Sequence, residues 1–178
     1  MKYIREKISK TRSKKIFYSS VLVWAFLGTI NILLNINEVM VLMEGSYTSL
    51  AFGLIGNYIS ALFSMYHMVI VTSLVTYFVA AAMNIGFDIK MFGRISAKAL
   101  AFAPLLGLSD MIGLVFWGEK LTNFGLLGLL SYIPFYFTTA YLHYAVLPDY
   151  ISTSKKQRVI LMIAATAAAM YASYPSMI

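Results

Sequence analysis

The stretch SAKALAFAPLLGLSDMIG, residues 96–113, is almost entirely apolar, yet it contains a proline, Pro104, and an acidic residue, Asp110. Residues 97–117 supply the roughly 20 mostly apolar residues that a helix needs to cross the hydrocarbon core of a membrane. Because residues four apart share a helix face, Ala99, Ala103 and Gly107 form a stripe of small side chains, and Asp110 lies on the same face. We therefore expect a membrane helix whose acidic residue is directed toward other helices.

The composition of the whole chain agrees with a membrane location. Of its 178 residues, 60% are hydrophobic and 12% are charged, whereas soluble domains average about 25% charged residues. Such a chain lacks the polar residues needed to cover a soluble surface. It also contains no cysteine, which excludes disulfides, thiolate metal sites and thiol nucleophiles.

Five apolar runs have the length of a membrane span. We expect a basic cytoplasmic segment at residues 1–15, followed by one all-α, five-helix transmembrane domain at residues 16–178, because open sheet edges are not stable in lipid. The expected spans are residues 16–36, 65–85, 97–117, 124–147 and 158–178. Residues 48–60 contain two glycines and Asn57, and we interpret them as an interfacial segment, a re-entrant segment or an outward extension of the second helix.

The positions of the basic residues predict the orientation of the chain. Cytoplasmic loops are enriched in Lys and Arg. With five spans and an inner N-terminus, thirteen of the fourteen basic residues lie inside and only Lys120 lies outside. The C-terminus is then expected on the outer side. A bacterial cytoplasmic membrane fits this arrangement best, and an organelle membrane stays open.

The net charge of +7 is concentrated at the N-terminus, where seven of the fourteen basic residues precede residue 16. Basic side chains beside a membrane helix are attracted to anionic lipid by about 1 kcal/mol each. We expect contacts with lipid headgroups from Lys10, Arg12, Lys14 and Lys15. An arm that docks a nucleic acid or a protein is the alternative; nothing beyond charge favours nucleic acid, and we expect none as a partner.

Helix packing within lipid relies on small residues that allow close approach. The fifth span carries Ala164, Ala168 and Ala172 at intervals of four, which predicts a second packing face. Two prolines inside predicted spans, Pro104 and Pro134, are expected to kink their helices. The freed carbonyl groups would be satisfied by neighbouring helices.

Asp110 is the one acidic residue inside a predicted span, and such residues are functional-site hypotheses by default. The depth of each residue along its helix places Asn31, Thr72 and Ser131 near the same level. One interpretation is a proton or cation site built from these four residues. The other, which we favour, is a structural acid that is hydrogen-bonded to Asn31 or to a hydroxyl group.

No motif of a known catalytic or nucleotide-binding class occurs in the chain. There is no HExxH, GxSxG or GxxxxGK[ST] pattern. The two histidines, His67 and His143, are expected at opposite membrane interfaces, which prevents them from sharing a metal. We expect no enzymatic activity, no metal and no cofactor.

The stretch VTYFVAAAMNIGFDIKMFGRISAKALAFAPLLGLSD, residues 75–110, resembles the Yip1 family, especially its short bacterial members. The resemblance includes a helix, a glycine, a basic inner loop and a helix with Ser and Ala leading to Pro, at Gly86, Arg94, Ser96, Ala103 and Pro104. VLPDYISTSKKQRVILMIAA, residues 146–165, resembles that family's short inner loop before a final helix. The similarity covers about residues 64–172. It implies membrane organisation or trafficking through protein contacts.

The leading functional hypothesis is therefore a non-enzymatic membrane protein that binds membrane partners, or a second copy of itself, through helix–helix contacts. One alternative is a small transporter or substrate-binding membrane subunit that uses Asp110. Another is an accessory membrane subunit of a larger respiratory, secretion or conjugation complex.

Overall fold

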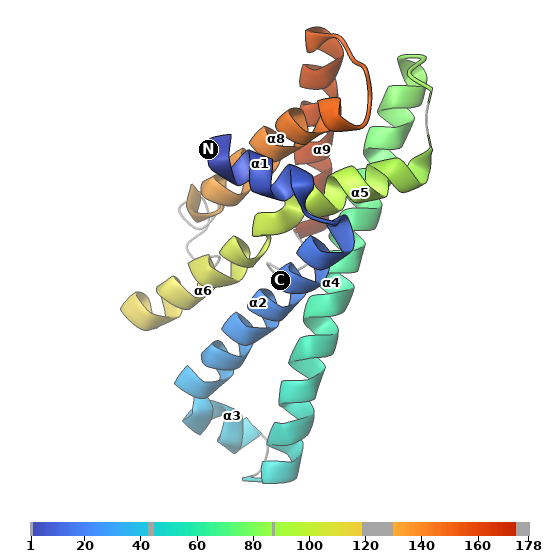
Figure 1. The fold of residues 1–178 in the computed structure, drawn as a ribbon. Helices are drawn as coiled ribbons and strands as arrows, with labels where there is room; N and C mark the ends of the chain where they lie inside the picture. Colours follow the sequence, from blue (N-terminus) through green and yellow to red (C-terminus); the bar gives the residue numbers. More distant parts are fainter. Residues whose placement is uncertain (1, 43–44, 87, 119–129, 174–178) are drawn as a thin grey trace.

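All regular elements that the computed structural model describes, across residues 2–42, 45–86, 88–118 and 130–173, are helical (Figure 1). In chain order they are α1 (Lys2–Lys10), α2 (Ser13–Leu34), α3 (Ile36–Leu42), α4 (Tyr47–Ala82), α5 (Ile89–Ala99), the 3-10 turn η1 (Leu100–Phe102), α6 (Pro104–Trp117), α8 (Ile133–Val146), the 3-10 turn η3 (Leu147–Asp149) and α9 (Lys155–Ser173). The all-α class predicted from the sequence is confirmed for this part of the chain.

Three helical stretches in the described residues are long and apolar enough to cross a membrane. They are Ser13–Leu34, Tyr47–Ala82 and Ile89–Phe116, and they overlap the first three predicted spans. The fourth predicted span, 124–147, lies partly outside the described residues, and its described part includes α8. The fifth predicted span corresponds to α9 up to Ser173.

α4 is one continuous helix of 36 residues and contains all of residues 48–60. It begins after Ser46, whose hydroxyl oxygen accepts a hydrogen bond from the backbone N–H of Ser49 at 3.3 Å. A helix of this length measures about 54 Å at 1.5 Å per residue, whereas the hydrocarbon core is about 30 Å thick. In the structure, residues 48–60 are therefore the first part of the second long helix rather than a separate segment.

The stretch quoted at the outset is interrupted, because α5 ends at Ala99 and α6 begins at Pro104. Proline has no N–H and is tolerated in the first turn of a helix. Beside the interruption, the Ser20 hydroxyl on α2 donates a hydrogen bond to the carbonyl of Ala101 at 2.9 Å. Pro134 likewise lies in the first turn of α8, so both prolines are found at the beginnings of helices.

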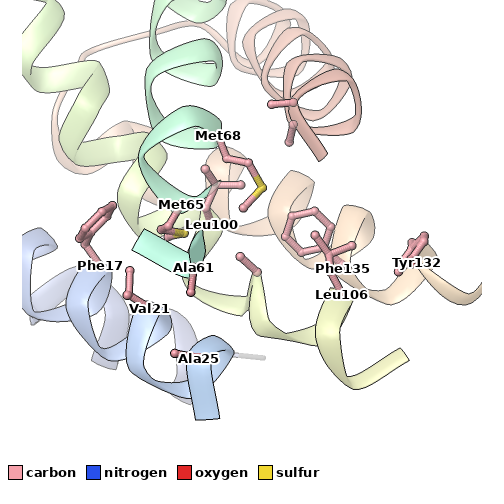
Figure 2. Packing of buried hydrophobic residues seen from close by; sticks show 13 residues of the cluster. Phe17, Val21, Ala25, Ala61, Met65, Met68, Leu100, Leu106, Tyr132 and Phe135 are labelled. Carbon is pink, nitrogen blue, oxygen red and sulfur yellow. The ribbon is translucent and has the colours of Figure 1, made fainter. Parts of the chain in front are cut away.

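Two clusters of buried apolar side chains hold the helices together. The first joins α2, α4, α6, α8 and α9, and Figure 2 shows its side chains converging between these helices. Its largest fully buried members are Met65, Met68, Leu100, Tyr132 and Phe135. The second joins α4, α5, η3 and α9 through Ala80, Phe92, Ile95, Leu147 and Leu161.

The predicted small-residue faces lie largely inside the bundle. Ala99 and Ala103 are fully buried, and a Cβ atom on Gly107 would lie 3.3 Å from the Trp24 ring. On α9, Ala168 and Ala172 are buried while Ala164 is half-buried. The most buried alanines of α9 are Ala165 and Ala169, so its packing face against α4 and α8 is centred one residue away from the predicted stripe.

The three basic segments meet at one end of the bundle. Lys98 of α5 donates a hydrogen bond to the carbonyl of Ser9 in α1, and the Ser9 hydroxyl donates one to the Asp149 carboxylate in η3. In Figure 1, α1 and the connections from α4 to α5 and from α8 to α9 lie in the upper part of the view, whereas α3 lies at the bottom. α1 is thus bonded to the bundle through Ser9.

Candidate functional site

Asp110 lies in the middle of α6 and faces the start of α8. Tyr132 is almost completely buried, and its hydroxyl donates a hydrogen bond to Asp110 Oδ1 at 2.8 Å. One residue earlier, the Ser109 hydroxyl donates to the carbonyl of Ser131 at 3.2 Å. These bonds connect α6 to the start of α8 where a polar group would otherwise face an apolar environment, which is costly without a partner.

The four residues predicted to form one polar site are divided among three places. Ser131 lies beside Tyr132 at the junction of α6 and α8, so it is near Asp110. Asn31 accepts a hydrogen bond from Asn35 Nδ2 at 2.9 Å on its own helix, α2. Thr72 is fully buried on α4. Tyr132 donates a hydrogen bond to Asp110, and the depth of residues along the helices did not predict this pairing.

A layer of buried polar residues lies between the two apolar clusters. We call it the polar layer, and it consists of Thr72, Thr76, Ser96, Thr139 and His143, each of which is fully buried. Along α4 the two threonines lie between Met68 of the first cluster and Ala80 of the second. The pairs on α4 and on α8 are four residues apart, so each pair shares one helix face.

Most of the polar layer has no hydrogen-bond partner within the described part of the protein. The atoms concerned are Thr72 Oγ1, Ser96 Oγ, Thr139 Oγ1 and both ring nitrogens of His143, whereas Thr76 Oγ1 donates to the carbonyl of Thr72 at 2.6 Å. A buried polar group that lacks a partner costs about 1–3 kcal/mol. The polar layer is therefore a costly arrangement that packing of the apolar clusters alone does not explain.

His143, expected near the inner membrane interface, lies inside the bundle rather than on its surface. His143 is fully buried, and α8 packs against both α5 and α9. The signal available in the sequence was the spacing of four between Thr139 and His143, which places two polar residues on one face of a helix. His67, the other histidine, is exposed on α4.

A groove runs between α2 and α4, with the end of α9 beside it. We call it the α2–α4 groove; its volume is about 520 Å³. Its lining is small or polar for the most part: Gly28, Asn57, Ser60, Ala61, Ser64, His67 and Ala172, together with Trp24, Phe63 and Met68. Asn57 Nδ2 donates to the carbonyl of Ala25 at 2.7 Å, which fixes the two helices at this point.

The four basic residues predicted to contact lipid headgroups, Lys10, Arg12, Lys14 and Lys15, are all exposed. Among the residues with a described placement, no three His, Asp or Glu side chains lie close enough together to hold a metal ion. Comparison of the chain with protein-family models, curated proteins and solved structures gives no match. The arguments for a function therefore rest on the geometry above.

Proposed function

We propose that the chain is an integral membrane protein that crosses the membrane five times and works, without catalysis, by binding another membrane protein. Three helices of sufficient length and apolarity support the membrane location. The two remaining crossings are assigned to residues 124–147 and 158–178. The N-terminus is placed on the cytoplasmic side and the C-terminus on the other, in agreement with the single basic end of the bundle.

The observation that carries the proposal is the lining of the α2–α4 groove. Membrane helices associate where small residues allow their backbones to approach, and Ser, Asn and His side chains bond across the interface. The face of α4 that lines the groove offers Asn57, Ser60 and Ser64, together with the exposed His67. We therefore propose a transmembrane helix of a partner as the occupant. This role is similar in kind to the protein contacts that the Yip1 resemblance implies.

Photocrosslinking within the membrane tests this proposal. A photoreactive phenylalanine analogue replaces Phe63, which lines the groove and is exposed. We expect a protein adduct that is lost when Ser64→Leu fills the groove. Ala51→Leu, on the exposed surface of the same helix outside the groove, is the matched control and keeps the adduct.

The identity of the adduct separates the forms of the proposal. An adduct with a second copy of this chain would show that the chain forms a homo-oligomer. An adduct with a subunit of a respiratory, secretion or conjugation complex would show that the chain is an accessory subunit of that complex. Adducts with lipid alone, together with a monomer in mild detergent, would refute the proposal.

A second candidate function is favoured by the polar layer, whose unpartnered atoms are suited to a small polar solute or an ion. Reconstituted liposomes test it by the flux of protons, Na⁺ or K⁺. Transport through the layer predicts a flux that Thr139→Val abolishes and that Thr138→Val, an adjacent threonine bonded to its own helix at 2.6 Å, leaves intact. If Asp110→Asn alone abolished the flux at unchanged folded yield, the site would be at Asp110 instead.

A further inference from the structure

A second pocket, between α2, α4 and α5, combines basic and aromatic side chains. We call it the basic pocket; its volume is about 380 Å³. Lys14 lies in the first turn of α2, and Lys90 and Arg94 are four residues apart on α5. All three are exposed. Three positive charges from two helices therefore surround one opening.

The floor of the basic pocket is apolar. Phe17 is buried in the first core cluster, and its ring meets that of Tyr66 on α4 edge to face at 4.8 Å. Gly93 of α5 lies between the two basic residues on that helix, and a Cβ atom added to it would have no neighbour within 4 Å. The absence of a side chain at Gly93 thus leaves the space beneath Lys90 and Arg94 open.

The basic pocket lies at the end of the bundle where the basic segments meet. Its position at the inner membrane surface rests on the orientation proposed above. Anionic headgroups at that surface bind basic pockets between membrane helices. Arg recognises phosphate with a planar fork of donors, and Lys acts on it as a compact charge.

We propose that the basic pocket binds the headgroup of an anionic phospholipid of the inner leaflet. Lys14, Lys90 and Arg94 contact its phosphate, and an acyl chain lies against the rings of Phe17 and Tyr66. The site differs from the general attraction of the N-terminal segment to lipid, since it takes two of its three charges from α5 and has a shaped apolar floor.

Thermal unfolding of the delipidated protein in neutral detergent tests this assignment. We expect phosphatidylglycerol to raise the apparent Tm by about 3 °C or more, since a ligand that binds only the folded state stabilises it. Phosphatidylcholine with the same acyl chains and inorganic phosphate are expected to give no such shift. An equal shift from either of these would overturn the proposal.

Two variants make the test specific for the pocket. Gly93→Leu fills it without any change of charge, and Lys90→Gln/Arg94→Gln removes two of its charges; either one alone, if folded, is expected to lose at least half of the phosphatidylglycerol shift. Lys155→Gln/Lys156→Gln removes two exposed charges in the first turn of α9 and keeps the shift. Equal losses in both double variants, or a full shift in Gly93→Leu, would overturn the proposal.

The two proposals fail independently. If the Phe63 crosslinks are absent while the phosphatidylglycerol shift persists, the partner function falls and the lipid site stands. The reverse result leaves the partner function and removes the lipid site.

Discussion

Gly28 on α2 shows how a single residue sets the distance between two helices. A Cβ atom at this position would lie 2.3 Å from Asn57 Oδ1 on α4, which is an impossible distance. The Asn57 amide also donates to the carbonyl of Ala25 and to the hydroxyl of Thr29 at 3.3 Å. The side chain of Asn57 therefore has little freedom to move away from residue 28.

We predict that Gly28→Ala lowers stability by about 1–3 kcal/mol, because overpacking forces helices or side chains to shift. Gly56→Ala is the matched control: it is a helical glycine on α4 with no atom within 4 Å of the added carbon. It is expected to raise stability by up to about 1 kcal/mol through helix propensity. Thermal unfolding in detergent measures both, and equal effects of the two substitutions would contradict the packing described here.

The hydroxyl group of Tyr132 connects the start of α8 to α6 through its hydrogen bond to Asp110. We predict that Tyr132→Phe lowers stability by about 1 kcal/mol, because it removes a hydrogen bond from the buried Tyr132 to the half-buried Asp110. Tyr58→Phe removes a hydroxyl from an exposed tyrosine on α4 and serves as the control. An unchanged Tm in Tyr132→Phe would show that the bond to Asp110 contributes nothing.

The orientation of Asp110 was predictable from the sequence, whereas its hydrogen-bond partner was not. Helical periodicity placed Asp110 on the face with Ala103 and Gly107, and in the structure that face meets α2 and α8. The pairing partner was not found, because depth along a straight helix ignores the rotation of each helix. Asn31 has a suitable depth, but it is bonded to Asn35 within α2.

At the scale of elements, the attachment of α1 depends on Lys98. This side chain is 4% exposed; its ammonium group donates to the carbonyl of Ser9 and lies 5.2 Å from the centre of the Tyr150 ring. A buried ammonium group requires such partners. Together with the hydrogen bond from the Ser9 hydroxyl to Asp149, this contact holds α1 against the bundle.

We predict that Lys98→Met, which keeps the length of the side chain, releases α1 from the bundle. The expected result is at least a several-fold faster cleavage of residues 2–15 by trypsin, with the rest of the chain protected. Lys90→Met, an exposed lysine on the same helix, is the control for the removal of one cleavage site. Equal cleavage rates in both variants would contradict the attachment.

The helices and the sites of their proline-linked breaks were largely predictable, whereas the way in which the helices cross was not. Long apolar runs predicted α2, α4 and α9 because their composition and length agree with a membrane helix. A kink was expected at Pro104, and the helix is interrupted just before it, but the 3-10 turn at Leu100–Phe102 was not foreseen. His143 was expected near the membrane surface, and it is buried inside the bundle.

At the scale of the whole molecule, the distribution of basic residues along the chain is the basis for the proposed orientation in the membrane. The basic residues of α1, α5 and α9 belong to segments far apart in the sequence, and the contacts of Ser9 bring α1, α5 and η3 together. The positive-inside rule predicts that these basic segments lie on one side of the membrane. The polar layer was not predictable, because its members come from three helices whose relative rotation only the structure gives.

Labelling of single cysteines tests the central claim, a five-crossing chain with its basic segments inside, most directly, since the natural chain contains no cysteine. Cysteines replace Ser46, Asp88, Lys120 and Ser154 one at a time, and a membrane-impermeant maleimide is added to intact cells. We expect that positions 46 and 120 are labelled at once and that positions 88 and 154 are labelled only after permeabilisation. Labelling of position 88 or 154 in intact cells, or protection of position 46, would contradict it.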